Sequence, residues 1–174
     1  MLDRIMRAIR LDRTLFRQVA DNPEYMNEAI IIAVAVAVVA GIGALFSPEQ
    51  PVLGFVGRFI NELLFGWVLW AAIAYVVGTN MFRGRSSVKE MMRTLAYASA
   101  PRLLGVFGVI PCVGWLFAIV GWALSIIAGV IAIRESMEFD NSSAVITAVL
   151  GLILYIVASV IIGLLLSPVS ILPA

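Results

Sequence analysis

The sequence lacks histidine, contains a single cysteine and carries few charged residues. Among its 174 residues there is no His and one Cys, and 13% are Asp, Glu, Lys or Arg. Histidine is the commonest general base and metal ligand, so its absence removes the most frequent basis for catalysis or metal binding. One cysteine cannot form an intramolecular disulfide or a thiolate metal cage. We therefore expect no enzyme activity, no catalytic residues, no metal and no cofactor.

Apolar residues are present in large excess. They make up 62% of the chain, whereas soluble domains are about 45–50% apolar. Twelve Lys and Arg against eleven Asp and Glu leave a net charge of +1, so no overall field attracts polyanions. This composition excludes a water-soluble globule, a disordered chain and a nucleic-acid-binding protein. It predicts an integral membrane protein whose first partner is the lipid bilayer.

Long apolar runs predict the membrane crossings. A hydrocarbon core of about 30 Å needs about 20 apolar helical residues. Four runs reach this length, at about 29–46, 61–82, 113–133 and 144–167. Of these, only the second carries a charge, Glu62, near its start. The fold class is therefore an all-α integral membrane protein.

A fifth segment, 94–110, carries Pro101 and Arg102 at its centre. An arginine at the middle of a crossing costs about 2.5–3.5 kcal/mol, and proline should kink the helix. Two features still favour a crossing. A single helix over 103–133 would be about 46 Å long, and the sequence Pro111-Cys112-Val113-Gly114 is typical of a tight turn. We expect a bundle of five transmembrane helices, with a re-entrant segment and four crossings as the alternative.

The distribution of basic residues predicts the orientation. Five crossings place ten of them on one side: Arg4, Arg7, Arg10, Arg13, Arg17, Arg83, Arg85, Lys89, Arg93 and Arg134. Only Arg58 falls in a loop on the other side. The positive-inside rule then places the N-terminus in the cytoplasm and the C-terminus outside. The expected location is a prokaryotic plasma membrane.

Residues 1–27 form a separate cytoplasmic segment, before a transmembrane domain over 28–167 and a short tail over 168–174. Within 2–19 the apolar residues recur at helical spacing. Two interpretations remain open. The amphipathic helix lies on the membrane surface, or it packs against the bundle and acts as an orientation signal.

The loop between the second and third crossings is a second cytoplasmic feature. Ser87 and Glu90 match a helix capping box. Methionine adapts to varied surfaces, so a partner protein could dock on the methionines and neighbouring cations. The alternative is that this face lies in the lipid interface. The candidate contact residues are Arg83, Arg85, Lys89, Met91 and Met92.

Arg102 is the strongest candidate for a functional residue, because a charge inside a membrane is functional by default. Glu62 is the obvious counter-ion. However, helical side chains lean toward their own N-terminus, so the two should lean apart in this topology. Arg58 is expected to satisfy Glu62 locally. Arg102 then either snorkels or bonds the carbonyls freed at Pro101, or it binds a ligand or relays protons.

The sequence resembles the Yip (Ypt-interacting protein) family of five-pass membrane proteins over residues 14–167. The pieces that carry the resemblance are Phe82-Arg83-Gly84 with Ser87, then Tyr97-Ala98-Ser99-Ala100-Pro101, then Ile110-Pro111-Cys112-Val113-Gly114-Trp115. The resemblance implies a five-pass fold with a cytoplasmic N-terminus. Eukaryotic relatives are associated with Rab-type GTPases and membrane traffic and carry a long N-terminal region. Here about 28 residues precede the first crossing, as in the prokaryotic branch.

The function that follows is that of a non-enzymatic scaffold or membrane-organising subunit, with a membrane-protein partner or self-association. Its candidate residues, besides those of the cytoplasmic loop, are Glu62, Tyr97, Pro101, Arg102, Pro111 and Gly114. The alternative is a small transporter or channel with its polar site at Pro101 and Arg102, since broken helices often build transport sites.

Overall fold

The computed structural model describes residues 1–46, 50–110 and 112–166, and every element in these ranges is helical. This confirms the all-α expectation. The elements are α1 (Leu2–Ile9), α2 (Arg13–Asp21), η1 (Pro23–Tyr25), α3 (Met26–Ile42), η2 (Gly43–Phe46), α4 (Pro51–Asn61), η3 (Glu62–Leu69), α5 (Trp70–Phe82), α6 (Val88–Ala98), η4 (Ala100–Val109), α7 (Gly114–Met137) and α8 (Asn141–Leu166).

Four helical stretches among the described residues are long and apolar enough to cross a membrane. They are Pro23–Leu45, Pro51–Phe82, Gly114–Met137 and Asn141–Ile161. Each overlaps one of the four uninterrupted apolar runs of the sequence. The chain is therefore a multi-pass integral membrane protein.

The N-terminal segment folds as two short helices. Leu11, between them, has a left-handed backbone with φ 60°. The Asp12 side chain caps α2 by accepting from the Thr14 N–H at 2.9 Å. Hydrogen bonds from the Thr14 hydroxyl and from Arg7 lower the pKa of Asp12 to about 2. The apolar face of α2 is buried against α6 and α7 rather than spread on the bilayer: Leu15, Phe16 and Val19.

The second crossing is longer than the sequence indicated. It begins at Pro51 rather than near residue 61, and α4, η3 and α5 form one helical stretch of 32 residues. Proline suits the first turn of a helix, where its missing N–H would have no partner anyway. Glu62 therefore lies near the middle of the stretch, at the start of the π-helical turns of η3.

The segment 94–110, which forms the end of α6 and η4, runs antiparallel to α7 along that helix. Ser87 caps α6 by accepting from the Glu90 N–H at 3.1 Å, as the capping box predicted. At this end Ser136 of α7 donates to Glu90, and at the other end Gly114 lies against the Gly108 backbone. The helix changes from α to 3-10 geometry between Ala98 and Ala100, just before Pro101.

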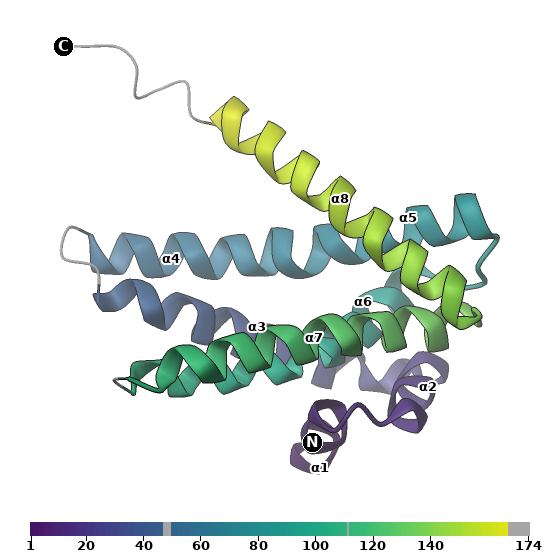
Figure 1. Ribbon diagram of the computed structural model, residues 1–174, viewed down its shortest axis with the longest axis horizontal. Coiled ribbons are helices and arrows are strands. Elements are labelled where there is room, and N and C mark those ends of the chain that lie inside the picture. The colour runs from purple at the N-terminus through teal and green to yellow at the C-terminus, as the bar shows by residue number, and fades with distance from the viewer. Residues whose placement is uncertain (47–49, 111, 167–174) are drawn as a thin grey trace.

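The last helix, α8, begins after Asp140, whose carboxylate accepts from the Ser142 and Ser143 N–H groups. It packs against α5 and α7. Figure 1 shows its N-terminal half crossing these helices and its C-terminal half standing away from the rest. Gly151 faces Trp70 of α5, since a Cβ added at Gly151 would lie 3.5 Å from the Trp70 ring.

Arg93 fastens α2 to α6. Its Nε donates to the Val19 carbonyl and its Nη2 to the Ala20 carbonyl, both at 2.6 Å. These carbonyls lie at the C-terminus of α2, where a helix leaves its last carbonyls without partners. From the sequence, Arg93 served only to predict the orientation. In the folded chain its side chain is buried and caps the C-terminus of α2.

Replacing Arg93 by Met should release α2. Two charge-assisted hydrogen bonds are lost, so we expect the free energy of unfolding to fall by about 2–3 kcal/mol. Hydrogen exchange measured by mass spectrometry should show faster exchange of the α2 amides. The control is Arg13→Met, at an exposed position on α2, which should leave the α2 amides protected. Equal protection of α2 in both variants would contradict the capping role.

Candidate functional site

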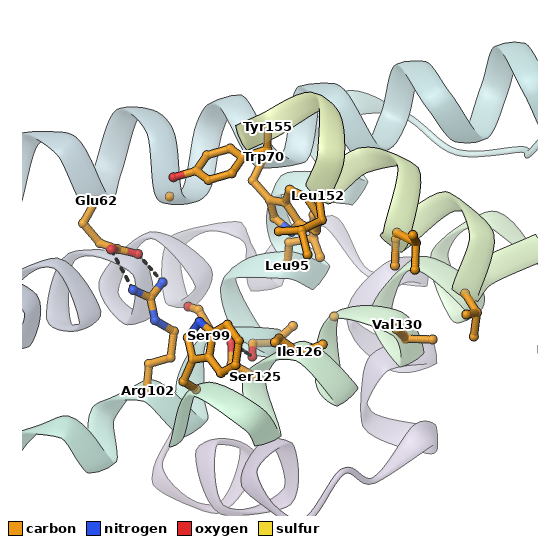
Figure 2. Close-up of a pocket in the computed structure, with 17 residues that line it drawn as sticks. Glu62, Trp70, Leu95, Ser99, Arg102, Ser125, Ile126, Val130, Leu152 and Tyr155 are labelled. Atoms are coloured by element: carbon orange, nitrogen blue, oxygen red, sulfur yellow. Dashed lines mark hydrogen bonds and ion pairs between the residues drawn. The ribbon is translucent and has the colours of Figure 1, made fainter. Parts of the chain in front are cut away.

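An ion pair joins the two charged side chains that the sequence placed inside the crossings. The Arg102 guanidinium, on η4, donates through Nη1 and Nη2 to the two carboxylate oxygens of Glu62, on η3. The Nη2–Oε2 distance is 2.8 Å. Figure 2 shows the two side chains pointing toward one another from helices 40 residues apart in the sequence. A bidentate pair of this kind is among the stronger polar contacts of proteins.

The expectation that these side chains lean apart is wrong, and Gly66 gives the reason. A Cβ at Gly66 would lie 2.7 Å from the carboxyl carbon of Glu62, so the carboxylate rests over the turn that follows it. Glu62 therefore leans toward the C-terminus of its helix, against the usual preference, because Gly66 leaves the space open. Arg58, expected to satisfy Glu62 locally, is exposed on α4.

The break at Pro101 is satisfied by α7 and not by Arg102. The Arg102 N–H bonds the Ser99 carbonyl in a 3-10 turn, which leaves the Ala98 carbonyl without its α-helical donor. The Ser125 hydroxyl donates to that carbonyl at 2.9 Å. A Cβ at Gly121 would lie 2.6 Å from the Pro101 carbonyl oxygen, so the two backbones approach closely. Pro101 itself is fully buried.

The ion pair borders a cavity of about 420 Å³. Residues from η3, α5, α6, η4, α7 and α8 line it, and most of the lining is apolar. Trp70 and Tyr155 meet edge to face with ring centroids 6.0 Å apart, and Figure 2 shows both among the lining residues beyond the ion pair. Arg102 also lines a second cavity of about 260 Å³, on the side of α3. Arg102 and Trp122 thus line both cavities.

Tyr97 belongs to a different cluster. Its hydroxyl donates to Glu28 Oε2 at 2.6 Å, and Arg4 Nε donates to the same oxygen at 2.7 Å. This cluster joins α1, α3 and α6. Glu28 precedes the first apolar run by one residue, so the apolar runs alone do not single it out. An acid at the start of a crossing, with arginines upstream, was the available signal.

The two turn residues singled out beside Cys112 have different outcomes. Gly114 is needed for close approach, since a Cβ there would lie 2.7 Å from the Gly108 carbonyl carbon. Cys112 takes a left-handed conformation with φ 69°. Pro111 lies outside the described residues.

The candidate contact residues of the cytoplasmic loop divide into two groups. Arg83, Arg85 and Lys89 are exposed. Met91 is fully buried, and the Met92 carbonyl accepts a hydrogen bond from Trp67 at 2.8 Å. Met91 therefore packs into the bundle between α3, α5 and α7, whereas Met92 is half-buried. The burial of Met91 removes it from the candidate contact residues.

Several polar contacts that the sequence did not reveal tie this end of the bundle together. Ser136 shares a hydrogen bond of 2.8 Å with Ser86 and donates to Glu90 at 3.2 Å. Arg17 of α2 donates to Glu138 at 2.6 Å and to the Glu135 carbonyl at 3.1 Å. The loop after α5, the start of α6, the end of α7 and α2 are thereby connected.

Comparison with known proteins gives one match. The model of a protein family described as the Yip1 domain matches residues 9–164, which is most of the chain. No curated protein and no solved structure matches the chain.

Breaking the ion pair from one side should cost more than removing it whole. Arg102→Leu or Glu62→Leu leaves a charge alone between the helices, and we expect a loss of about 3 kcal/mol in unfolding free energy. The double variant Glu62→Leu/Arg102→Leu should lose less than either single variant. Unfolding of the purified proteins in the same mild detergent measures this double-mutant cycle. Strictly additive losses would contradict direct pairing.

Gly66 should resist even the smallest substitution. In Gly66→Ala the new methyl group collides with the Glu62 carboxylate, so we expect a loss of about 1–2 kcal/mol. The matched control is Gly57→Ala on α4, where an added Cβ meets nothing within 4 Å. That change should be neutral or stabilising, because alanine favours helix. Equal stability of the two variants would remove Gly66 from the explanation of the pairing.

Proposed function

We propose, from the fact that this chain belongs to the Yip1 domain family, that it is a non-enzymatic membrane scaffold that recruits a partner at its cytoplasmic end. The chain is an integral membrane protein with several apolar crossings. The proposed partner is a protein with an acidic surface on the cytoplasmic side. The proposed residence is the plasma membrane of a prokaryote.

The observation that carries this proposal is the fixed end of the bundle that presents the exposed cations of the loop after α5. Buried and half-buried polar contacts lock α2, the start of α6 and the end of α7 to one another. Three exposed cations stand on this framework, on the loop and the first turn of α6: Arg83, Arg85 and Lys89. A rigid element with exposed charge suits recognition of a complementary surface, because little ordering is needed on binding.

The proposed topology has five crossings. The additional crossing is the segment 94–110, third in chain order. Its support is that α6 and η4 lie along α7 from Ser136 to Gly114. The end of the bundle with Arg83, Arg85 and Lys89 then faces the cytoplasm, with the N-terminus inside and the C-terminus outside. Under this assignment residues 1–27 form the cytoplasmic segment and 28–167 the transmembrane domain. The proposed tail, 168–174, lies outside the described residues.

A small transporter is the second candidate. Its support is that Arg102 lines two cavities, one on each side of η4. The helix also changes geometry beside it, as at many transport sites. The ion pair with Glu62 argues against this candidate, since the guanidinium is already neutralised. Solute flux into liposomes separates the two functions, because a scaffold carries no flux.

Reversing the exposed charges should abolish partner binding. In native membranes, a photo-crosslinker at position 85 should capture one stoichiometric protein. Arg83→Glu/Lys89→Glu should reduce the yield about tenfold or more, since each rim charge contributes to association. A crosslinker at position 58, and the variant Arg13→Glu at an exposed position of α2, serve as controls. Recovery of this protein with lipid alone, together with liposome flux, would overturn the scaffold and favour the transporter.

A further inference from the structure

The larger cavity opens sideways, onto the apolar flank of the bundle. Trp122 of α7 and Val149 and Leu152 of α8 line it, and these side chains are 60%, 51% and 40% exposed. Figure 1 shows α8 diverging from the bundle beyond its crossing with α5. In a bilayer this flank faces lipid, so a molecule dissolved in the hydrocarbon can reach these lining residues.

The cavity lies near mid-depth. Its α7 lining residues run from Trp122 to Val130, the middle of the helix Gly114–Met137. The headgroup of a phospholipid is about 15 Å from the bilayer centre, half of a core of about 30 Å. A polar group that reaches Arg102 must therefore belong to a molecule able to carry it into the hydrocarbon, which requires that the group be uncharged.

The charges of the site select the same kind of polar group. The Glu62–Arg102 pair is neutral as a whole, and an added ion would be costly in this medium. Arg102 is the more accessible partner, with 31% of its side chain exposed against 14% for Glu62. A guanidinium has five N–H donors and no acceptor, and Glu62 engages two nitrogens here. The site therefore offers donors to a ligand that brings an oxygen acceptor.

The two serine hydroxyls beside Arg102 already donate to backbone carbonyls, so the Tyr155 hydroxyl is the hydroxyl of the lining that can assist Arg102. Ser99 Oγ donates to the Ala96 carbonyl at 2.7 Å, and Ser125 Oγ donates to the Ala98 carbonyl at 2.9 Å. The remaining wall is apolar and aromatic, and its volume of about 420 Å³ falls in the range of small-molecule sites.

We propose that this cavity binds an uncharged, single-chain lipid whose polar end carries an oxygen acceptor. The oxygen accepts from the Arg102 guanidinium, and the hydrocarbon chain packs against Trp70, Trp122 and Leu152. This site is independent of the cytoplasmic contact residues, so it stands whether or not the scaffold function is correct.

The test uses the full chain in phosphatidylcholine nanodiscs and a photoactivatable long-chain alcohol. Peptide mapping should place the label on cavity-lining segments of η3–α5, η4 or α8. Hexadecanol should compete at about tenfold lower mole fraction than hexadecane, because it forms a hydrogen bond to a charged donor. Hexadecyltrimethylammonium should not compete. Equal competition by alcohol and alkane, or equal labelling by a photoactivatable phosphatidylcholine chain, would overturn the proposal.

Two variants test whether the label reports on this cavity. Gly129 lines the cavity and is buried, yet an added Cβ there meets nothing within 4 Å. Gly129→Leu should therefore fill the cavity and remove the labelling, while Gly57→Leu, at a comparably open glycine on α4, should retain it. Glu62→Leu/Arg102→Leu should abolish the preference for alcohol over alkane. Undiminished labelling of folded Gly129→Leu would overturn the assignment to this cavity.

Discussion

Every backbone polar group inside a bilayer needs a partner within the protein, and the junction of α6 and η4 is where this chain meets that requirement with a side chain. The turn from α to 3-10 geometry frees the Ala98 carbonyl, and Ser125 of α7 supplies the missing donor. That bond holds only if α7 lies close, which Gly121 permits beside the Pro101 carbonyl. The antiparallel course of η4 and α7, and the direction in which Arg102 leaves the backbone, follow from this contact.

Once η4 is held against α7, Arg102 needs a counter-charge within the bundle, and Glu62 provides it. The pair can form because Gly66 lets the carboxylate turn toward it. A neutral pair keeps the inserted arginine at an acceptable energy, and both of its residues line a cavity. The end of the bundle that contains α2 and the start of α6 is held together differently. There Arg93 and Arg17 donate to carbonyls at the ends of helices instead of lying free in solvent.

Features that depend on local sequence were predictable. Apolar runs located the four long crossings, Ser87 capped α6, and Asp140 capped α8, because length, hydropathy and capping act within a few residues. Predictions that required knowledge of a facing helix were the ones that failed. Met91 looked like an accessible contact and is buried, and Glu62 was expected to lean away from Arg102 but pairs with it.

The sequence by itself determined that this is an all-helical membrane protein with most of its charged residues in the segments at one end, because composition and the spacing of apolar residues decide which segments leave water. Only the tertiary structure decided which polar groups meet: Arg102 with Glu62, Tyr97 with Glu28, and Arg93 with the end of α2. Each of these contacts joins helices far apart in the sequence. The geometry of the Arg102–Glu62 pair depends on Gly66, on Gly121 and on the change of helix type at η4, which alter how closely, and in which direction, the side chains approach.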